Sequence, residues 1–293
     1  MYQTLLVPLD GSEAAEIVVP YVAYIGAKLG SNVILVTVSE SAHPDLDHLY
    51  RTYLEQIRER VRILLKSRGI EEPSRVSSSV LLGNPADQIL SYADESGADL
   101  VIMASRGSSR HGPWLLGSIA AKVLRASLKP VLLIRAPMDS SAEGQGKIFR
   151  RILVPLDGSP AGEAALPYVQ AIAKALDAEL VLYDALEPVT TLAAYGAGAS
   201  VAIPQSYFES VKDSASVYLE SVRKRLSQQG IVATTEVQDG RPADLILEYA
   251  QSKDIDMIAM STHGRSGVGR WVFGSVTDKV LHSGDTPVLV VRA

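Results

Sequence analysis

Two glycine–serine motifs have the residue types and the spacing of a phosphate-binding loop. Each motif is a glycine, nine intervening residues and then a Gly-Ser pair. The residues are Gly107, Gly117 and Ser118 in the first half of the 293-residue chain and Gly264, Gly274 and Ser275 in the second. Glycine lets a backbone come close to an anion, and a helix that begins at Gly-Ser offers phosphate free N–H groups and a favourable dipole. We therefore expect one phosphate-binding loop in each half.

An aspartate follows the first apolar segment of each half. Residues 5–12 read LLVPLDGS and residues 152–159 read ILVPLDGS, so Asp10 and Asp157 are equivalent. Either aspartate could cap the helix that follows, although a serine two positions later is also available as the cap. The alternative is a contact with a ligand.

The elements that position these loops follow from the apolar pattern. In the first half, strands are predicted at 4–9, 33–38, 75–82, 100–104 and 131–135, and helices at 12–29, 49–68, 86–95 and 117–127. Strands that alternate with helices indicate a parallel sheet with right-handed crossovers. The predicted fold is α/β, with two tandem doubly wound five-stranded parallel-sheet domains of strand order 3-2-1-4-5 and flanking helices. In that order a ligand binds between strands one and four, and the aspartate and glycine loops follow these two strands.

A proline lies inside the first helix predicted in each half. These residues are Pro20 and Pro167. A proline within a helix removes one hydrogen bond and usually kinks the helix. We therefore expect one kinked helix after the first strand of each half.

The repeat runs the length of both halves. LLGSIAAKVL at 115–124 matches VFGSVTDKVL at 272–281, and PVLLIRA at 130–136 matches PVLVVRA at 287–293. Between the halves, Pro, Gly and Ser without apolar periodicity favour a linker. We predict a first domain at 1–137, a linker at 138–147 and a second domain at 148–293.

The last strands of the two halves are expected to pair with each other. Residues 131–134 and 288–291 are apolar throughout. In the order 3-2-1-4-5 the fifth strand is a sheet edge, and an exposed apolar edge promotes aggregation. Pairing of the two edges avoids this hazard, and it predicts that the two domains of one chain pack as a pseudo-dimer.

The second half carries an apolar insertion at 188–205. An apolar loop of this length is unusual in a compact domain. It could pack on the first domain, pack on a second subunit or cover the site as a lid, and the sequence does not choose among these.

Together these motifs resemble the universal stress protein family. Its ATP-binding members carry Gly-two-Gly-nine-Gly-Ser/Thr after the fourth strand and an aspartate after the first. The resemblance covers nearly the whole chain, once in each half, although Ala104 and Ser261 stand where the family pattern has its first glycine. It implies that Asp10 and Asp157 contact the adenosine part of ATP, and that any Mg²⁺ binds through the phosphates.

The ATP-binding residues that the motifs and the resemblance imply come from the loops after strands one, two and four and from the helix that follows. In the first half they are Pro8, Leu9, Asp10, Val38, Met103, Arg106, Gly107, Gly117, Ser118 and Ile119. In the second half they are Pro155, Leu156, Asp157, Ala185, Met260, Ser261, His263, Gly264, Arg265, Gly274, Ser275 and Val276. At Arg110 and Pro113 the glycine loop of the first half differs from that of the second, so we expect the second site to bind more tightly.

Composition excludes several classes of protein. The net charge of −5 argues against general nucleic-acid binding, which needs a basic face. The absence of cysteine removes disulfides, thiolate catalysis and cysteine-based metal sites. The N-terminus lacks a signal-peptide pattern, and no apolar stretch is long enough to span a membrane. We expect a cytoplasmic protein with neither membrane nor nucleic-acid partners.

These observations favour a nucleotide-responsive regulatory protein that binds ATP or a related adenine nucleotide. No residue stands out as a general base with a paired carboxylate for Mg²⁺, so strong catalysis and a metal site of the protein's own are not expected. Slow ATP hydrolysis and a nucleotide-free structural or chaperone-like dimer remain as alternatives. We also expect a homo-oligomer of whole chains, and the sequence does not identify a protein partner.

Overall fold

The first half of the chain forms a five-stranded parallel sheet. The structure is a computed structural model that describes residues 1–70, 75–107, 116–135, 148–187, 191–193, 200–202, 205–264 and 273–293. The strands are β1 (Thr4–Pro8), β2 (Asn32–Ser39), β3 (Val76–Leu82), β4 (Leu100–Ala104) and β5 (Val131–Ile134). They lie in the order β3-β2-β1-β4-β5, and all four pairs are parallel. The predicted order 3-2-1-4-5 is therefore confirmed.

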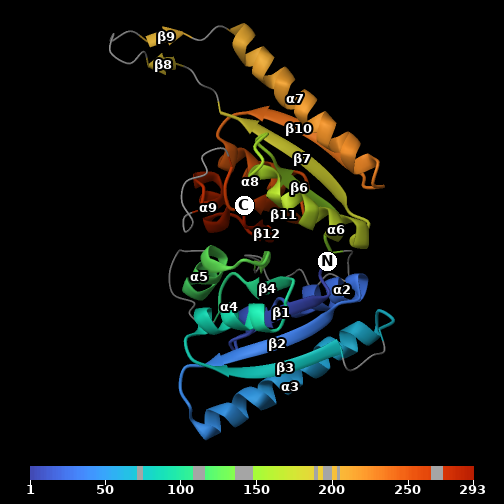
Figure 1. Ribbon diagram of the computed structural model, residues 1–293, viewed down its shortest axis with the longest axis vertical. Helices are drawn as coiled ribbons and strands as arrows, with labels where there is room; N and C mark the ends of the chain where they lie inside the picture. The colour runs from blue at the N-terminus through green and yellow to red at the C-terminus, as the bar shows by residue number, and fades with distance from the viewer. Residues whose placement is uncertain are drawn as a thin grey trace.

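The second half repeats this sheet. Its strands are β6 (Arg151–Pro155), β7 (Glu179–Leu186), β10 (Ala233–Asp239), β11 (Met257–Ser261) and β12 (Val288–Val291). They lie in the order β10-β7-β6-β11-β12, again with parallel neighbours. Within the predicted insertion, β8 (Thr191–Ala193) and β9 (Ser200–Ala202) pair antiparallel. This pair projects away from the sheet of the second domain in Figure 1. The remaining residues of the insertion before 205, and the linker predicted at 138–147, lie outside the described residues.

The two half-sheets join into one sheet of ten strands, because β5 and β12 pair antiparallel. In the register, Val131 lies opposite Val290, and Leu132 lies opposite Leu289. All four side chains are buried. The predicted pairing of the two last strands is confirmed.

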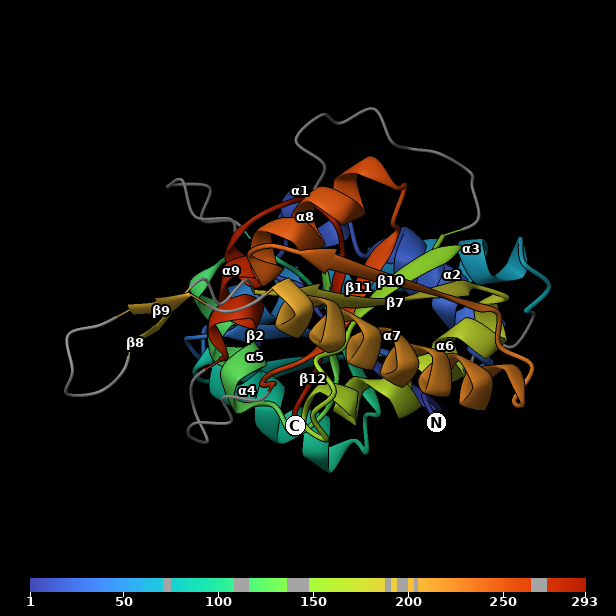
Figure 2. The ribbon, with the colours of Figure 1, turned by 90° about the horizontal axis from the view of Figure 1, so that it is seen from above.

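Helices cover both faces of this sheet (Figure 2). One apolar core lies between the sheet and α2 (Val19–Leu29), α3 (Pro44–Lys66), α6 (Leu166–Leu176) and α7 (Gln205–Ser227). A second core lies between the other face and α4 (Pro85–Glu95), α5 (Ser118–Ala126), α8 (Pro242–Ser252) and α9 (Ser275–His282). Burial of both faces explains why the strands read as continuous apolar runs.

The prediction of one kinked helix at 12–29 is wrong. The segment forms two helices, α1 (Glu13–Glu16) and then α2, and Pro20 lies in the first turn of α2. A proline is favoured in a first turn because its missing N–H would have no helical partner there. In the second half, Pro167 likewise opens α6 after the short 3₁₀ helix η2 (Gly162–Ala165). Each proline therefore starts a new helix.

The long helix of the first domain also begins earlier than predicted. We expected it from residue 49, whereas α3 starts at Pro44. Pro44 suits the first turn, and Asp45 and Asp47 place negative charge at the positive end of the helix dipole. The extra turn brings α3 close to the carboxyl ends of the strands.

Aromatic residues form a second contact between the domains. Tyr2 and Phe149 occupy equivalent positions just before β1 and β6, and both are fully buried. Both also adopt a positive φ, 65° and 62°, which costs energy for residues other than glycine. The Tyr2 hydroxyl donates a hydrogen bond to the Tyr168 carbonyl at 3.1 Å, and the Phe149 ring lies 5.6 Å from that of Tyr21. Cross-domain packing compensates this strained conformation.

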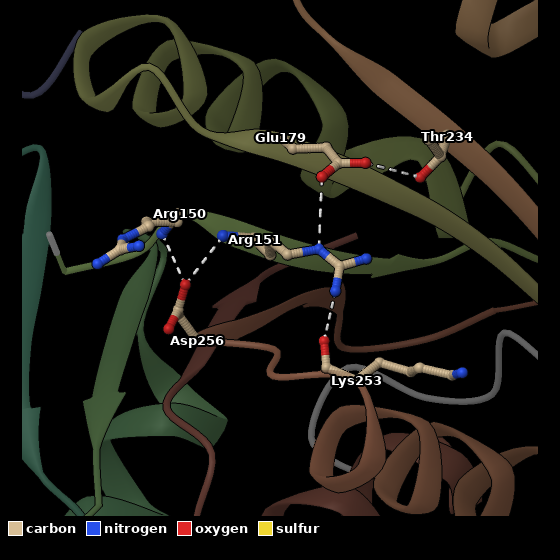
Figure 3. Close-up of polar contacts among 6 residues, drawn as sticks. All are labelled: Arg150, Arg151, Glu179, Thr234, Lys253 and Asp256. Atoms are coloured by element: carbon tan, nitrogen blue, oxygen red, sulfur yellow. Dashed lines mark hydrogen bonds and ion pairs between the residues drawn. The ribbon is translucent and has the colours of Figure 1, made fainter.

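Polar contacts fix the amino ends of the strands in the second domain (Figure 3). Asp256 accepts hydrogen bonds from the backbone N–H groups of Arg150 and Arg151 at 2.7 and 2.9 Å. The Arg151 side chain pairs with Glu179 at 3.4 Å and donates to the carbonyl of Lys253, the C-cap of α8, at 2.5 Å. This end of the sheet is opposite to the end where the aspartate and glycine loops lie.

Candidate functional site

In each domain a cavity lies at the carboxyl ends of the parallel strands. The first has a volume of about 500 Å³ and the second about 530 Å³. Both volumes lie in the range of small-molecule pockets. Each cavity is bounded by the loops after the first and fourth strands of its domain, at the switch point where the strand order reverses.

The structure brings the predicted site residues together. All ten predicted in the first half line the first cavity: Pro8, Leu9, Asp10, Val38, Met103, Arg106, Gly107, Gly117, Ser118 and Ile119. In the second half, eleven line the second cavity: Pro155, Leu156, Asp157, Ala185, Met260, Ser261, His263, Gly264, Gly274, Ser275 and Val276. Arg265, Arg110 and Pro113 lie outside the described residues. The part these residues play in binding stays a prediction.

The aspartate of each cavity holds the serine that follows it. Oδ1 of Asp10 accepts hydrogen bonds from the backbone N–H and the hydroxyl of Ser12, at 3.0 and 2.6 Å. The Ser12 hydroxyl in turn caps α1 by accepting from the N–H of Ala15 at 3.2 Å. Asp157 holds Ser159 with the same two distances. Serine therefore makes the bond to the helix, and the aspartate keeps a second carboxylate oxygen toward the loop after the fourth strand.

Gly107 and Gly264 are needed because the aspartates lie against them. A Cβ atom at Gly107 would overlap Oδ2 of Asp10, and one at Gly264 would overlap Oδ2 of Asp157. Neither glycine has a positive φ, so space and not backbone conformation requires glycine here. The first glycine of each motif thus lets the two loops of the switch point touch.

The helices that open onto the cavities begin with exposed backbone donors. Gly117 and Gly274 are the N-caps of α5 and α9, and among the described residues no side chain caps either helix. The first-turn N–H groups and the positive ends of the two helix dipoles are therefore available to an anion. Ser118 and Ser275, the first helical residues, add a hydroxyl at the same place.

The described linings of the two cavities differ in charge. The described lining of the first carries Asp10, Glu40 and Arg106. The described lining of the second carries four carboxylates, those of Asp157, Asp184, Glu187 and Asp239. His263 stands where the first cavity has Arg106, its Nδ1 lies 3.0 Å from the Thr262 hydroxyl, and its buried Nε2 has no hydrogen-bond partner among the described residues.

A repeated polar network supports the aspartate loop from behind. In the second domain, Glu163 of η2 accepts hydrogen bonds from the Tyr218 hydroxyl and from Arg225 of α7, both at 2.9 Å. Burial raises the pKa of Tyr218, and the bond to Glu163 raises it further, so the hydroxyl keeps its proton. In the first domain, Glu16 accepts from Arg60 at 3.0 Å in the same arrangement. The network ties the segment after each aspartate to the long helix of its domain.

Residues of the long helices also line the cavities, and the sequence analysis missed them. Leu46 and Tyr50 of α3 line the first cavity, and Tyr207 and Phe208 of α7 line the second. The sequences around these positions differ between the two halves, so the repeat did not mark them as site residues. Glu40 and Glu187, which follow the second strand in both halves, could have been found from the repeat.

Two features are absent from the described residues. Within the residues described, no group of three or more His, Asp or Glu side chains is placed to hold a metal ion. No helix in the described part of the chain is long and apolar enough to cross a membrane.

The fold and the cavities define a class of protein: two doubly wound α/β domains, each with a ligand-sized cavity at its switch point, paired through their last strands. The family model described as the universal stress protein family matches residues 1–135 and again 148–292. The chain belongs to the universal stress protein family and is a tandem, two-domain member of it. The boundaries predicted for the domains and linker stay a prediction.

Relatives and solved structures agree with this assignment. Universal stress protein MJ0531 of Methanocaldococcus jannaschii is 32% identical over 147 residues, which is 50% of this chain and 83% of that protein. Universal stress protein Slr1230 of Synechocystis is 22% identical and covers 99% of this chain and 100% of its own length. A universal stress protein from Archaeoglobus fulgidus has a TM-score of 0.66 at 22% identity, and the match covers 100% of this chain and 99% of that one. This structural likeness concerns the fold.

Proposed function

We propose that the protein binds ATP or a related adenine nucleotide in its two cavities and acts as a stress-response regulator without rapid catalysis. The observation that carries the proposal is the pairing, in each cavity, of a fixed aspartate with the N-terminus of a helix that no described side chain caps. A carboxylate accepts hydrogen bonds from ribose hydroxyls, and a helix N-terminus binds phosphate. The two ends of a nucleotide thus have one partner each.

Apolar side chains in the same cavities suit a base. Val38, Met103 and Ile119 line the first cavity, and Ala185, Met260 and Val276 line the second. Small-molecule sites are mostly apolar with a few placed polar groups, and these cavities have that character.

The carboxylates of the second cavity affect whether it binds the nucleotide free or with Mg²⁺. Four acidic residues in the described lining oppose a free polyphosphate, since like charges repel. Mg²⁺ bound through the phosphates would lower that charge, because it prefers phosphate and carboxylate oxygens. Nucleotide affinity of the second cavity should therefore depend on Mg²⁺ more strongly than that of the first.

The test uses calorimetric titration of ATP into the wild-type chain, Asp10→Ala, Asp157→Ala and the double variant. Two sites are expected in the wild type, one in each single variant and none in the double variant. An unchanged affinity in the double variant would refute the assignment of the aspartates.

The nucleotide extracted from the native protein, denatured at intervals after purification, separates the alternatives. ATP that stays intact over time supports the regulator, and conversion to ADP supports the slow ATPase. An empty extract together with no titration heat supports the nucleotide-free structural or chaperone-like dimer.

A further inference from the structure

The helix that opens onto the second cavity is contacted at both ends by the first domain. α9 supplies Ser275, Val276 and Thr277 to the cavity lining. Figure 1 shows α9 close to the boundary between the domains, across from α5 of the first domain. Two arginines of the first domain, Arg135 after β5 and Arg125 of α5, make these contacts.

Arg135 caps the C-terminus of α9 across the domain boundary. Arg135 is buried, with only 4% of its surface exposed. Its guanidinium donates four hydrogen bonds, at 2.5 to 3.0 Å, to the carbonyls of Val280, Leu281, Ser283 and Gly284. The last carbonyls of a helix have no partner within the helix, and a cation there also complements the dipole. One buried side chain of the first domain thus satisfies two of the last four carbonyls of α9 and the two carbonyls of Ser283 and Gly284 just beyond the helix.

The charge of Arg135 persists at neutral pH. Burial lowers the pKa of its guanidinium to about 10, and the nearby Asp285 carboxylate opposes this shift. The side chain is therefore still a full cation when the protein is at pH 7, as the contact with the helix C-terminus requires.

Arg125 contacts the other end of α9. Its guanidinium carbon lies 5.9 Å from the centre of the Phe273 ring, a cation–π distance. Phe273 is buried and directly precedes Gly274, the N-cap of α9. Because Phe273 adjoins the N-cap, its contact with Arg125 helps to fix the position of the first-turn N–H groups.

We propose that Arg135 and Arg125 of the first domain are positioning residues of the second cavity. α9 has only eight residues, so fraying of its last turn reaches half of the helix. By holding both ends, the two arginines keep the N–H groups of the first turn aimed into the cavity. The second cavity is then a site that both domains complete, and its affinity depends on their pairing. The affinity part of this inference rests on the proposed function.

The test measures ATP binding to the second cavity alone, in an Asp10→Ala background. Arg135→Gln should raise the dissociation constant about tenfold, a change within the range of helix-terminus charge effects. Arg135→Lys keeps the charge but not the four-donor geometry, so it should recover part of the loss. Arg125→Gln replaces an exposed side chain, leaves folding intact and should weaken binding about threefold, as for an exposed cation–π contact.

Two controls separate positioning from a general loss of stability. In an Asp157→Ala background, Arg135→Gln should leave the first cavity unchanged. Arg151→Gln removes another arginine that donates to a helix C-cap, Lys253 of α8, but within the second domain (Figure 3). It should lower stability without a comparable loss of affinity.

Amide hydrogen exchange provides a readout that needs no nucleotide. Arg135→Gln should speed exchange at 278–282, the amides that are hydrogen-bonded within α9, while 121–126 of α5 keeps its protection. Failure of the wild type to bind ATP would count against the proposed function, and exchange would still decide the role of Arg135. Unchanged exchange at 278–282, or an equal loss of affinity in both cavities, would overturn the inference.

Discussion

Gly264→Ala is the sharpest test of how the second cavity is built. The added methyl group would overlap Oδ2 of Asp157. The carboxylate sits there because Ser159 holds its other oxygen with two hydrogen bonds, at 3.0 and 2.6 Å. The methyl group therefore forces the Asp157 side chain to rotate. The rotated carboxylate no longer bonds to Ser159 and no longer lines the cavity.

The size of the effect follows from the bonds that are lost. A hydrogen bond to a charged group contributes about 1.5–3 kcal/mol, so loss of the aspartate contact to a ligand should weaken binding about 10- to 100-fold. At the same contribution per bond, loss of the two bonds from Ser159 should lower the free energy of unfolding by up to about 3–6 kcal/mol, and hydration of the released carboxylate reduces this loss. Titration of ATP in the Asp10→Ala background and urea unfolding measure the two quantities.

Two matched variants complete this experiment. Gly107→Ala makes the same overlap with Asp10 and should weaken the first cavity only. Gly26→Ala adds a methyl group inside α2, where its nearest neighbour would be 3.5 Å away, and should leave both cavities unchanged. If Gly264→Ala binds ATP like the parent chain, the aspartate does not contact the nucleotide and the reasoning fails.

Three further predictions concern assembly, pH and catalysis. Val290→Lys places a charge in the buried β5–β12 pairing and should cost about 3–5 kcal/mol in urea unfolding, whereas Val232→Lys, at a position 66% exposed, should change stability by less than about 0.5 kcal/mol; equal melting of the two variants would contradict the pairing. Burial raises the pKa of six tyrosines: Tyr2, Tyr21, Tyr53, Tyr183, Tyr218 and Tyr249. Because unfolded tyrosines ionise near pH 10 and these do so later, the stability they contribute is complete below about pH 10 and falls as pH rises further; urea unfolding from pH 8 to 11 should show this decline, and a flat profile would count against it. ATP turnover, followed by phosphate release, should stay below about 1 per second, the lower end of ordinary enzyme rates; a faster rate would require the enzyme interpretation.

The sequence by itself was enough to predict the strand order of each half-sheet and the position of the cavities. Apolar strands that alternate with helices permit few topologies, so the strand order and the switch point followed from local pattern. The pairing of the last strands followed from composition, since an apolar edge such as 131–134 must be covered. The aspartates and glycines were found because both are local motifs that the repeat shows twice.

Only the tertiary structure decided which distant residues meet those motifs. Pro20 looked like a kink because its helix boundary depends on how α1 and α2 pack on the sheet. Tyr50 and Tyr207 reach the cavities because each long helix crosses its sheet at one particular angle, which no local pattern encodes. Arg135 follows a strand and reads as an ordinary polar end of that strand, yet its partners lie 145 to 149 residues away. Contacts over such separations are set by the packing of whole elements, and packing exists only once the two domains have folded and joined.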